Sequence, residues 1–143
     1  DRNDVAVIAR DAKAENIPLS ILSGDAMRAA NQPIALAEGV RAVALPEYAL
    51  LREGTAAADA LRAKGTEPEG YVLPSLAAAL IAGQAAEAAV QAGEPLQETL
   101  LGTTFQTPVG PVAFTGGHEL SQNPYRLLEW RGNGFFPPAA PTQ

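Results

Sequence analysis

Residues 3–46 have the sequence NDVAVIARDAKAENIPLSILSGDAMRAANQPIALAEGVRAVALP. Apolar side chains recur at intervals of three and four within residues 5–12, which predicts an amphipathic helix. Residues 18–22 and 40–45 are short apolar runs of the kind that form strands, and Ser23-Gly24-Asp25 is a turn into a further helix. Helices that alternate with strands favour an α/β fold built on a doubly wound parallel sheet.

The strongest helical pattern in the chain covers residues 74–92. Pro74 suits the first turn of a helix, where a missing N–H costs nothing, and Gly93 suits the C-terminal cap. The positions that follow the helical period are Leu73, Leu76, Ala77, Leu80, Ile81, Gln84, Ala85 and Ala88. We expect this stripe to face the core.

Shorter elements are expected on both sides of this helix. Thr55 suits the N-cap of a helix that runs to Lys64, and Glu94-Pro95 begins a helix that ends at Gly102. After Gly102 the pattern becomes that of strands, which we expect over residues 103–106, 111–114 and 125–131, followed by a flexible tail over residues 137–143.

The composition excludes several classes of partner. The 143 residues include 10 basic and 16 acidic side chains, a net charge of −6, so there is no basic stripe for nucleic acid or for an anionic membrane surface. The chain has no cysteine, which excludes disulfides and thiolate metal sites. Because Gly, Pro or a charged residue interrupts each apolar run, we expect no membrane-spanning segment.

No set of residues indicates catalysis, a metal site or a cofactor. His118, the only histidine, lies in a Gly-rich segment between expected strands, where a surface turn residue is the simplest interpretation. Without a second histidine or a cysteine, no usual metal-ligand spacing can be assembled. No serine lies in a G-x-S-x-G motif, and the glycines do not form a phosphate-binding loop. We therefore expect a protein that is not an enzyme.

Asp25 and Tyr71 are the candidate binding residues, and each has two interpretations. Asp25 follows an expected strand, so it can cap a helix that begins near Ala26. The same position suits a ligand, because ligands of open α/β sheets lie beyond the carboxyl ends of the strands. A carboxylate there binds an ammonium group by charge-assisted hydrogen bonds. Tyr71 is either a core aromatic residue or part of a cleft wall.

Seven segments of the chain carry a family resemblance. In chain order they are IARDAK (8–13), SGD (23–25), AEGV (37–40), EPEGY (67–71), TPVGPVAF (107–114), NPYRL (123–127) and EWRGNG (129–134). Together they resemble the C-terminal part of the periplasmic substrate-binding proteins of branched-chain amino acid ABC transporters. The resemblance covers nearly the whole chain and is carried by the order and spacing of the segments.

The resemblance implies a fold of two α/β lobes that close over a ligand in the cleft between them. It implies a periplasmic solute-binding component of an ABC importer, which takes a branched-chain or related amino acid and docks on a membrane permease. Asp25 would receive the ammonium group of the amino acid, and Tyr71 would lie at the cleft edge. The alternative is a ligand-sensing domain of the same fold, in which closure signals to a partner.

The resemblance also implies a division of the chain between the lobes. Residues 1–66 would belong to the second lobe, residues 67–122 to the first, and residues 123–136 to the second again. The family's chain is more than twice as long, so one wall of the cleft would come from sequence upstream of Asp1. We therefore expect this chain to associate with a missing N-terminal segment or with a second copy of itself.

Overall fold

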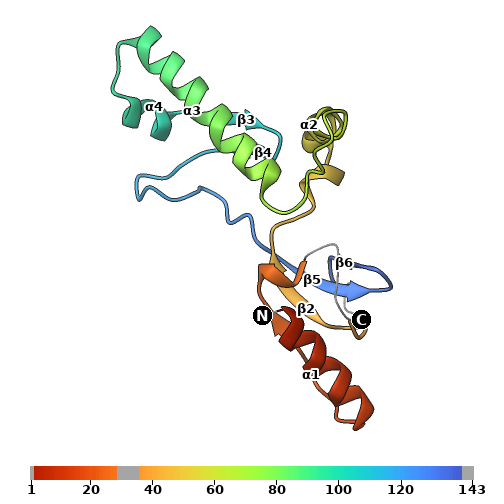
Figure 1. Cartoon of the computed structure of the whole chain (residues 1–143). Coiled ribbons are helices and arrows are strands. Elements are labelled where there is room, and N and C mark those ends of the chain that lie inside the picture. The colour runs from red at the N-terminus through yellow and green to blue at the C-terminus, as the bar shows by residue number, and fades with distance from the viewer. Residues whose placement is uncertain (1, 29–35, 140–143) are drawn as a thin grey trace. The chain divides into compact units, whose positions relative to one another are not determined.

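The structure, a computed structural model, describes residues 2–28 and 36–139, and its internal contacts divide the chain into two units (Figure 1). Unit 1 comprises Asp1–Pro46 and Pro124–Gln143, and unit 2 comprises Glu47–Asn123. The chain thus passes from unit 1 to unit 2 after Pro46 and returns at Pro124. The boundary expected after residue 66 therefore differs from the division seen in the contacts, which groups residues 47–66 with the segment that follows.

Unit 1 contains a four-stranded sheet of order β1-β2-β5-β6. Its elements are α1 (Arg2–Ala14), β1 (Leu22–Ser23), the 3-10 helix η1 (Asp25–Arg28), β2 (Arg41–Ala44), β5 (Arg126–Arg131) and β6 (Gly134–Phe136). Strands β1 and β2 are parallel, as the alternation of helices and strands predicts. The β2–β5 and β5–β6 pairs are antiparallel. The expected helix after Asp25 is a single 3-10 turn as far as Arg28, and its expected continuation lies in residues 29–35, outside the described residues.

The core of unit 1 lies between α1, η1 and one face of this sheet. Its buried members are Ala6, Met27, Leu36 and Ala42, with Val5, Trp130 and Phe135 packed against them. The rings of Trp130 and Phe135 meet edge to face, with their centroids 5.3 Å apart. Trp130 therefore closes one side of this cluster.

Strand β6 is not expected from the sequence. Gly132 has a φ of 63° and, with Asn133, forms the two-residue turn of the β5–β6 hairpin. The Gly132 N–H donates to the Glu38 carboxylate at 2.8 Å, and this bond holds the turn to the loop before β2. Beyond β6, the Arg131 guanidinium donates to the carbonyl of Pro137. Residues 140–143 of the expected tail lie outside the described residues.

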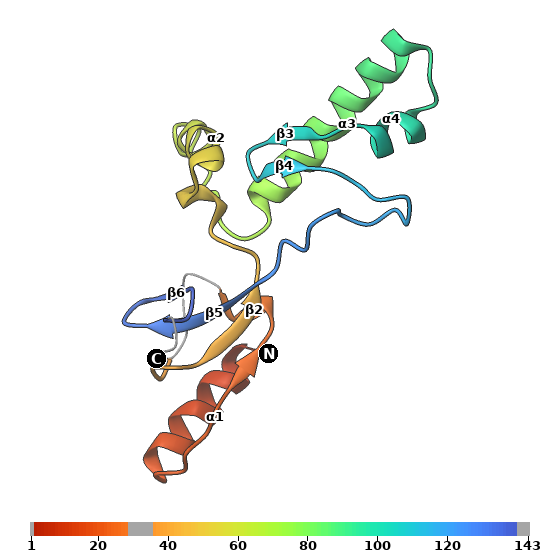
Figure 2. The same cartoon turned by 180° about the vertical axis from the view of Figure 1, so that it is seen from behind.

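Unit 2 is mainly helical. Its elements are the 3-10 helix η2 (Tyr48–Leu50), α2 (Arg52–Arg62), α3 (Val72–Ala92), α4 (Leu96–Gly102), β3 (Phe105–Thr107) and β4 (Gly110–Val112). The antiparallel β3–β4 hairpin lies along α3 (Figure 2). The core of unit 2 consists of Ile81, Ala85 and Phe105, and Leu100, Val112 and Phe114 pack around these residues.

The long helix α3 confirms the strongest sequence prediction, but its buried face is narrower than the predicted stripe. Gly93 is left-handed, with a φ of 67°, and ends the helix as expected. The buried residues are Leu73, Ala77, Ile81, Ala85 and Ala89, at strict intervals of four. Of the other predicted positions, Leu80 and Gln84 are exposed and Leu76 and Ala88 are half-buried. The expected stripe was too wide, because most of this helix is apolar on every side.

Neighbouring residues of α3 give a matched test of this face. We expect Ile81→Ala to lower the free energy of unfolding by about 2–5 kcal/mol, because Ile81 is a buried core residue and the change leaves a cavity. Leu80 is 39% exposed, so Leu80→Ala should cost less, about 1 kcal/mol. Denaturant titrations of both variants measure the two costs. Equal costs would contradict a buried face that contains Ile81 and leaves Leu80 exposed.

Helix α3 is also long and apolar enough to cross a membrane, by length and composition alone, and it is the one such helix among residues 2–28 and 36–139. The expected interruption of each apolar run by Gly, Pro or a charged residue therefore does not shorten this helix. Pro74 lies in the first turn and Gly83 is tolerated within the helix, so neither interrupts it. Core helices of soluble proteins meet the same criterion, and Ile81 and Ala85 of α3 lie in the core of unit 2.

Candidate ligand-binding residues

Asp25 lies at the carboxyl end of β1, where the sequence places it. It follows Gly24 and begins η1, whose first turn is closed by a hydrogen bond from the Met27 N–H to the Gly24 carbonyl at 3.1 Å. Met27 is among the largest fully buried side chains, so this short helix is fixed to the core of unit 1. Because β1 and β2 are parallel, Asp25 lies beyond the end of the sheet at which both strands have their carboxyl ends.

The carboxylate of Asp25 is already engaged by the backbone. Its Oδ1 accepts a hydrogen bond from the N–H of Leu45 at 3.0 Å, and the Asp25 side chain is half-buried. Leu45 directly follows β2, 20 residues along the chain from Asp25. A helix cap would require an Asp25 oxygen on an N–H of its own first turn, so the bond to Leu45 is a different structural role from the one expected. Within the described residues, Oδ2 has no hydrogen-bond partner.

Tyr71 lies in unit 2 at the start of α3. Its φ and ψ of −93° and 9° place it at the N-cap, and its carbonyl accepts the hydrogen bond from the Ser75 N–H at 2.8 Å. Gly70, with a φ of 57°, turns the chain into this position. The Tyr71 side chain is 54% exposed, so it is not a core aromatic residue. Asp25 and Tyr71 thus belong to different units of the chain.

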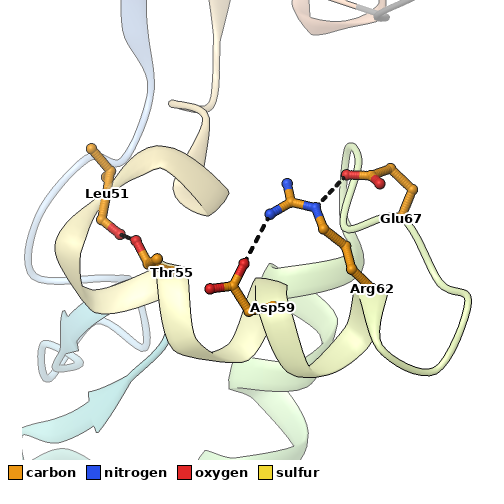
Figure 3. Close-up of polar contacts among 5 residues, drawn as sticks. All are labelled: Leu51, Thr55, Asp59, Arg62 and Glu67. Atoms are coloured by element: carbon orange, nitrogen blue, oxygen red, sulfur yellow. Dashed lines mark hydrogen bonds and ion pairs between the residues drawn. The ribbon is translucent and has the colours of Figure 1, made fainter.

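An ion-pair network joins the end of α2 to the segment before Tyr71. Figure 3 shows the Arg62 guanidinium between Glu67, at 3.0 Å, and Asp59, at 3.2 Å. The hydrogen bond that the Arg62 guanidinium donates to the Glu67 carboxylate is the main cause that raises the pKa of Arg62 above its ordinary value. All three side chains are exposed, so the network orients the segment and adds little stability. Glu67 therefore has a structural partner.

Figure 3 also corrects the predicted start of α2. The helix begins at Arg52, and its N-cap is Leu51. Thr55 lies one turn inside the helix, where its hydroxyl donates to the carbonyl of Leu51 at 2.9 Å. The prediction of a Thr55 N-cap is therefore wrong, although the helix itself and its end before Gly65 are as expected.

His118 occupies the turn that the sequence predicts. It has a φ of 65°, and its N–H donates to the carbonyl of Thr115 at 2.9 Å. The N–H of Thr115 donates in turn to the carbonyl of Glu119 at 2.8 Å, and the His118 side chain is exposed. In the part of the chain that the structure describes, no group of three or more His, Cys, Asp or Glu side chains is placed to hold a metal ion.

One contact at the candidate site could not be found from the sequence pattern. The bond between Asp25 and Leu45 joins residues with no periodic relation, and only the parallel pairing of β1 and β2 brings them together. The available signal is Pro46. A strand that ends at a proline leaves its preceding N–H without a continuing ladder, and a nearby carboxylate is a natural acceptor.

Comparison with known proteins supports the sequence resemblance. No family model matches the chain. A leucine-, isoleucine-, valine-, threonine- and alanine-binding protein of Pseudomonas aeruginosa is 34% identical over 74 residues, which cover 50% of this chain and 20% of that protein. The predicted resemblance to branched-chain amino acid binding proteins is thereby confirmed.

A solved structure confirms the fold class. An extracellular ligand binding receptor from Desulfohalobium retbaense superposes with a TM-score of 0.64 over 93% of this chain, at 20% sequence identity. The chain therefore has part of a periplasmic-binding-protein-like α/β fold. It spans about a quarter of that receptor and about a fifth of the Pseudomonas protein.

Proposed function

We propose that this chain is part of the extracytoplasmic solute-binding component of an ABC importer for a branched-chain or related amino acid. The observation that carries the proposal is the alignment of half of the chain with a binding protein for leucine, isoleucine, valine, threonine and alanine. Both matched proteins bind ligands by name and neither is named as an enzyme, which agrees with a chain that catalyses nothing. In this proposal the protein lies in the periplasm and docks on a membrane permease.

The binding chemistry we propose rests on Asp25. Its carboxylate stands at the carboxyl ends of two parallel strands and is half-buried, which strengthens its attraction for an ammonium group. With Oδ1 on the Leu45 N–H, Oδ2 is the oxygen that we assign to the ammonium of the amino acid. The exposed ring of Tyr71 supplies apolar surface for the ligand at the cleft edge.

Units 1 and 2 correspond in this proposal to parts of the two lobes. The chain passes between them twice, at Pro46 and at Pro124. Because the chain spans a quarter or less of the matched proteins, the remaining wall of the cleft would come from further sequence of the same protein. An intertwined second copy of this chain is the other way to cover the surface left open.

A ligand-sensing domain is the second candidate function. The solved structure that the chain resembles is named a receptor, which favours a role in signalling as much as one in uptake. The complete reading frame distinguishes the two candidates. A secretory signal peptide without further domains favours transport, and a fused output domain favours sensing.

The test of the proposed function is leucine binding by the complete protein. We expect Asp25→Asn to weaken binding by about 1.5–3 kcal/mol, which is the value of a hydrogen bond to a charged group and corresponds to roughly tenfold to a hundredfold in Kd. Asp11→Asn, which changes an exposed carboxylate of α1 paired with Arg10, is the control and should leave binding unchanged. Isothermal titration calorimetry measures both variants.

Two results of this calorimetry would contradict the proposal. Wild-type affinity in Asp25→Asn would remove the ammonium role of Asp25. Tight leucine binding by the 143-residue chain alone would contradict the proposal that further sequence supplies the remaining wall of the cleft, because a cleft with one wall buries too little of the ligand.

A further inference from the structure

The chain passes between the two units twice, and both passages begin at matched positions in the sheet of unit 1. Strands β2 and β5 pair up to Ala44 and Arg126, the last pair of their ladder at this end. Two residues beyond that pair lies Pro46 on one strand and Pro124 on the other, and the unit boundary falls at these prolines. Proline has no N–H and a fixed φ, so the β2–β5 ladder cannot continue through either passage.

Leu45 is the residue between the ladder and Pro46, and its backbone needs a partner. It is 6% exposed, and a buried N–H without an acceptor costs as much as a lost hydrogen bond. As the residue before a proline, Leu45 is also restricted to an extended conformation. Its N–H is the last backbone donor of this strand before the chain leaves unit 1, because Pro46 has none.

Asp25 supplies the acceptor, and it is held in place to do so. Its Oδ1 lies 3.0 Å from the Leu45 nitrogen, and η1 is fixed to the core of unit 1 through the buried Met27. We propose that Asp25 is a positioning residue, whose carboxylate fixes the point at which the chain leaves unit 1 and couples a ligand bound to that carboxylate to the passage itself. The part of this inference that concerns the ligand rests on the proposed function. The anchor, which is the hydrogen bond from the Leu45 N–H to the Asp25 carboxylate, does not depend on it.

The coupling follows from linkage. If the Leu45 N–H opens only when the Asp25 carboxylate moves away, opening also breaks the contact with a bound ammonium group. A ligand that binds only the closed form then slows opening by the factor 1 + [ligand]/Kd, which is about 100-fold at a leucine concentration of about 100 times Kd. Exchange of the Leu45 amide hydrogen measures this opening directly.

Unit 1 offers a matched control for the same chemistry. The Gly132 N–H also donates to a carboxylate, that of Glu38, at 2.8 Å, and it lies beyond the opposite end of β5. Gly132 should therefore respond to substitution of Glu38 and not to substitution of Asp25 or to leucine. The two amides report separately on the passage and on general stability.

The experiment is amide hydrogen exchange by NMR on the complete protein. Asp25→Ala should accelerate exchange at Leu45 by about tenfold or more, the expected effect of losing a hydrogen bond to a charged group. Asp25→Asn should preserve most of the Leu45 protection, because its amide oxygen also accepts a hydrogen bond. Glu38→Ala should accelerate Gly132 alone. At a leucine concentration of about 100 times the wild-type Kd, leucine should slow Leu45 about 100-fold in the wild type and only about 2- to 11-fold in Asp25→Asn, whose Kd is weaker.

Each result supports or overturns one part of the inference. Unchanged Leu45 exchange in Asp25→Ala overturns the anchor, and a wild-type Leu45 amide that does not respond to leucine overturns the coupling. Wild-type leucine affinity in Asp25→Asn overturns the proposed ammonium role, while the anchor is judged from Asp25→Ala alone. Should Asp25→Ala not fold, scalar coupling across the hydrogen bond between the Leu45 nitrogen and the Asp25 carboxyl carbon tests the anchor in the wild type, and its absence overturns it.

Discussion

Phe105→Ala is expected to lower the free energy of unfolding by about 3–5 kcal/mol, because it removes the largest fully buried side chain of unit 2 and leaves a cavity. Phe105 is 2% exposed and lies in β3 against Ile81 and Ala85 of α3. Backbone atoms of the hairpin cannot fill the space, since β3 is held to β4 by its ladder. Denaturant titration of the full chain, followed by circular dichroism, measures the loss.

A second phenylalanine provides the control for this prediction. Phe136 lies in β6 of unit 1 and is 45% exposed, so Phe136→Ala should cost about 1 kcal/mol. The denaturant midpoint should shift strongly for Phe105→Ala with an unchanged slope, since the surface exposed on unfolding hardly changes. Equal shifts for the two variants would contradict a core centred on Phe105.

The sequence predicts the elements of this chain better than the faces they bury. Helix α3 follows from its period and from Gly93, which suits the left-handed cap observed there. Its buried face follows only in part, because Leu73, Ala77, Ile81 and Ala85 lie within the predicted stripe. Alanines surround the helix and no polar side opposes an apolar one, so the stripe was predicted too wide. Packing against α4 and β3 decides the orientation, and the contacts of Phe105 in β3 with Ile81 and Ala85 join residues far apart in the sequence.

Short elements and long-range contacts account for most of the remaining differences. The hairpin strand β6 has three residues, too few for a period of two to be recognised. Helix α2 begins after the N-cap Leu51 without a side-chain cap, so the N-cap predicted at Thr55 is four residues too late. The boundary of the units lies at Pro46, where the ladder ends, whereas the acidic segment around Glu67 is held to α2 by Arg62.

The candidate site shows the same division between local and distant information. That Asp25 follows a strand and stands at a sheet edge is visible in the sequence, because it depends on neighbouring residues. Its bond to Leu45 depends on the pairing of two strands and is visible only in the structure. The roles proposed for Asp25 and Tyr71 in ligand binding stay predictions until leucine binding is measured.

The entry of the chain into unit 2 leads to the other prediction of large effect, Gly54→Ala. Gly54 is buried in the first turn of α2, close to η2, the first element after the passage at Pro46. A Cβ at Gly54 would lie 2.0 Å from the carbonyl oxygen of Tyr48 and 3.0 Å from that of Pro108. Both are backbone atoms, so relief requires η2 or the β3–β4 turn to move. We expect a loss of about 3 kcal/mol in the free energy of unfolding.

Gly83, in the interior of α3, is the matched control because a Cβ there would meet nothing within 4 Å. Gly83→Ala should stabilise the protein by about 0.5–1 kcal/mol, since alanine loses less backbone entropy in a helix. The same substitution in two helices of one unit is therefore expected to have opposite signs, and thermal unfolding of the two variants compares them. If Gly54→Ala raised the melting temperature as Gly83→Ala does, α2 would not be packed against Tyr48 and Pro108, and the entry into unit 2 would be fixed by other contacts.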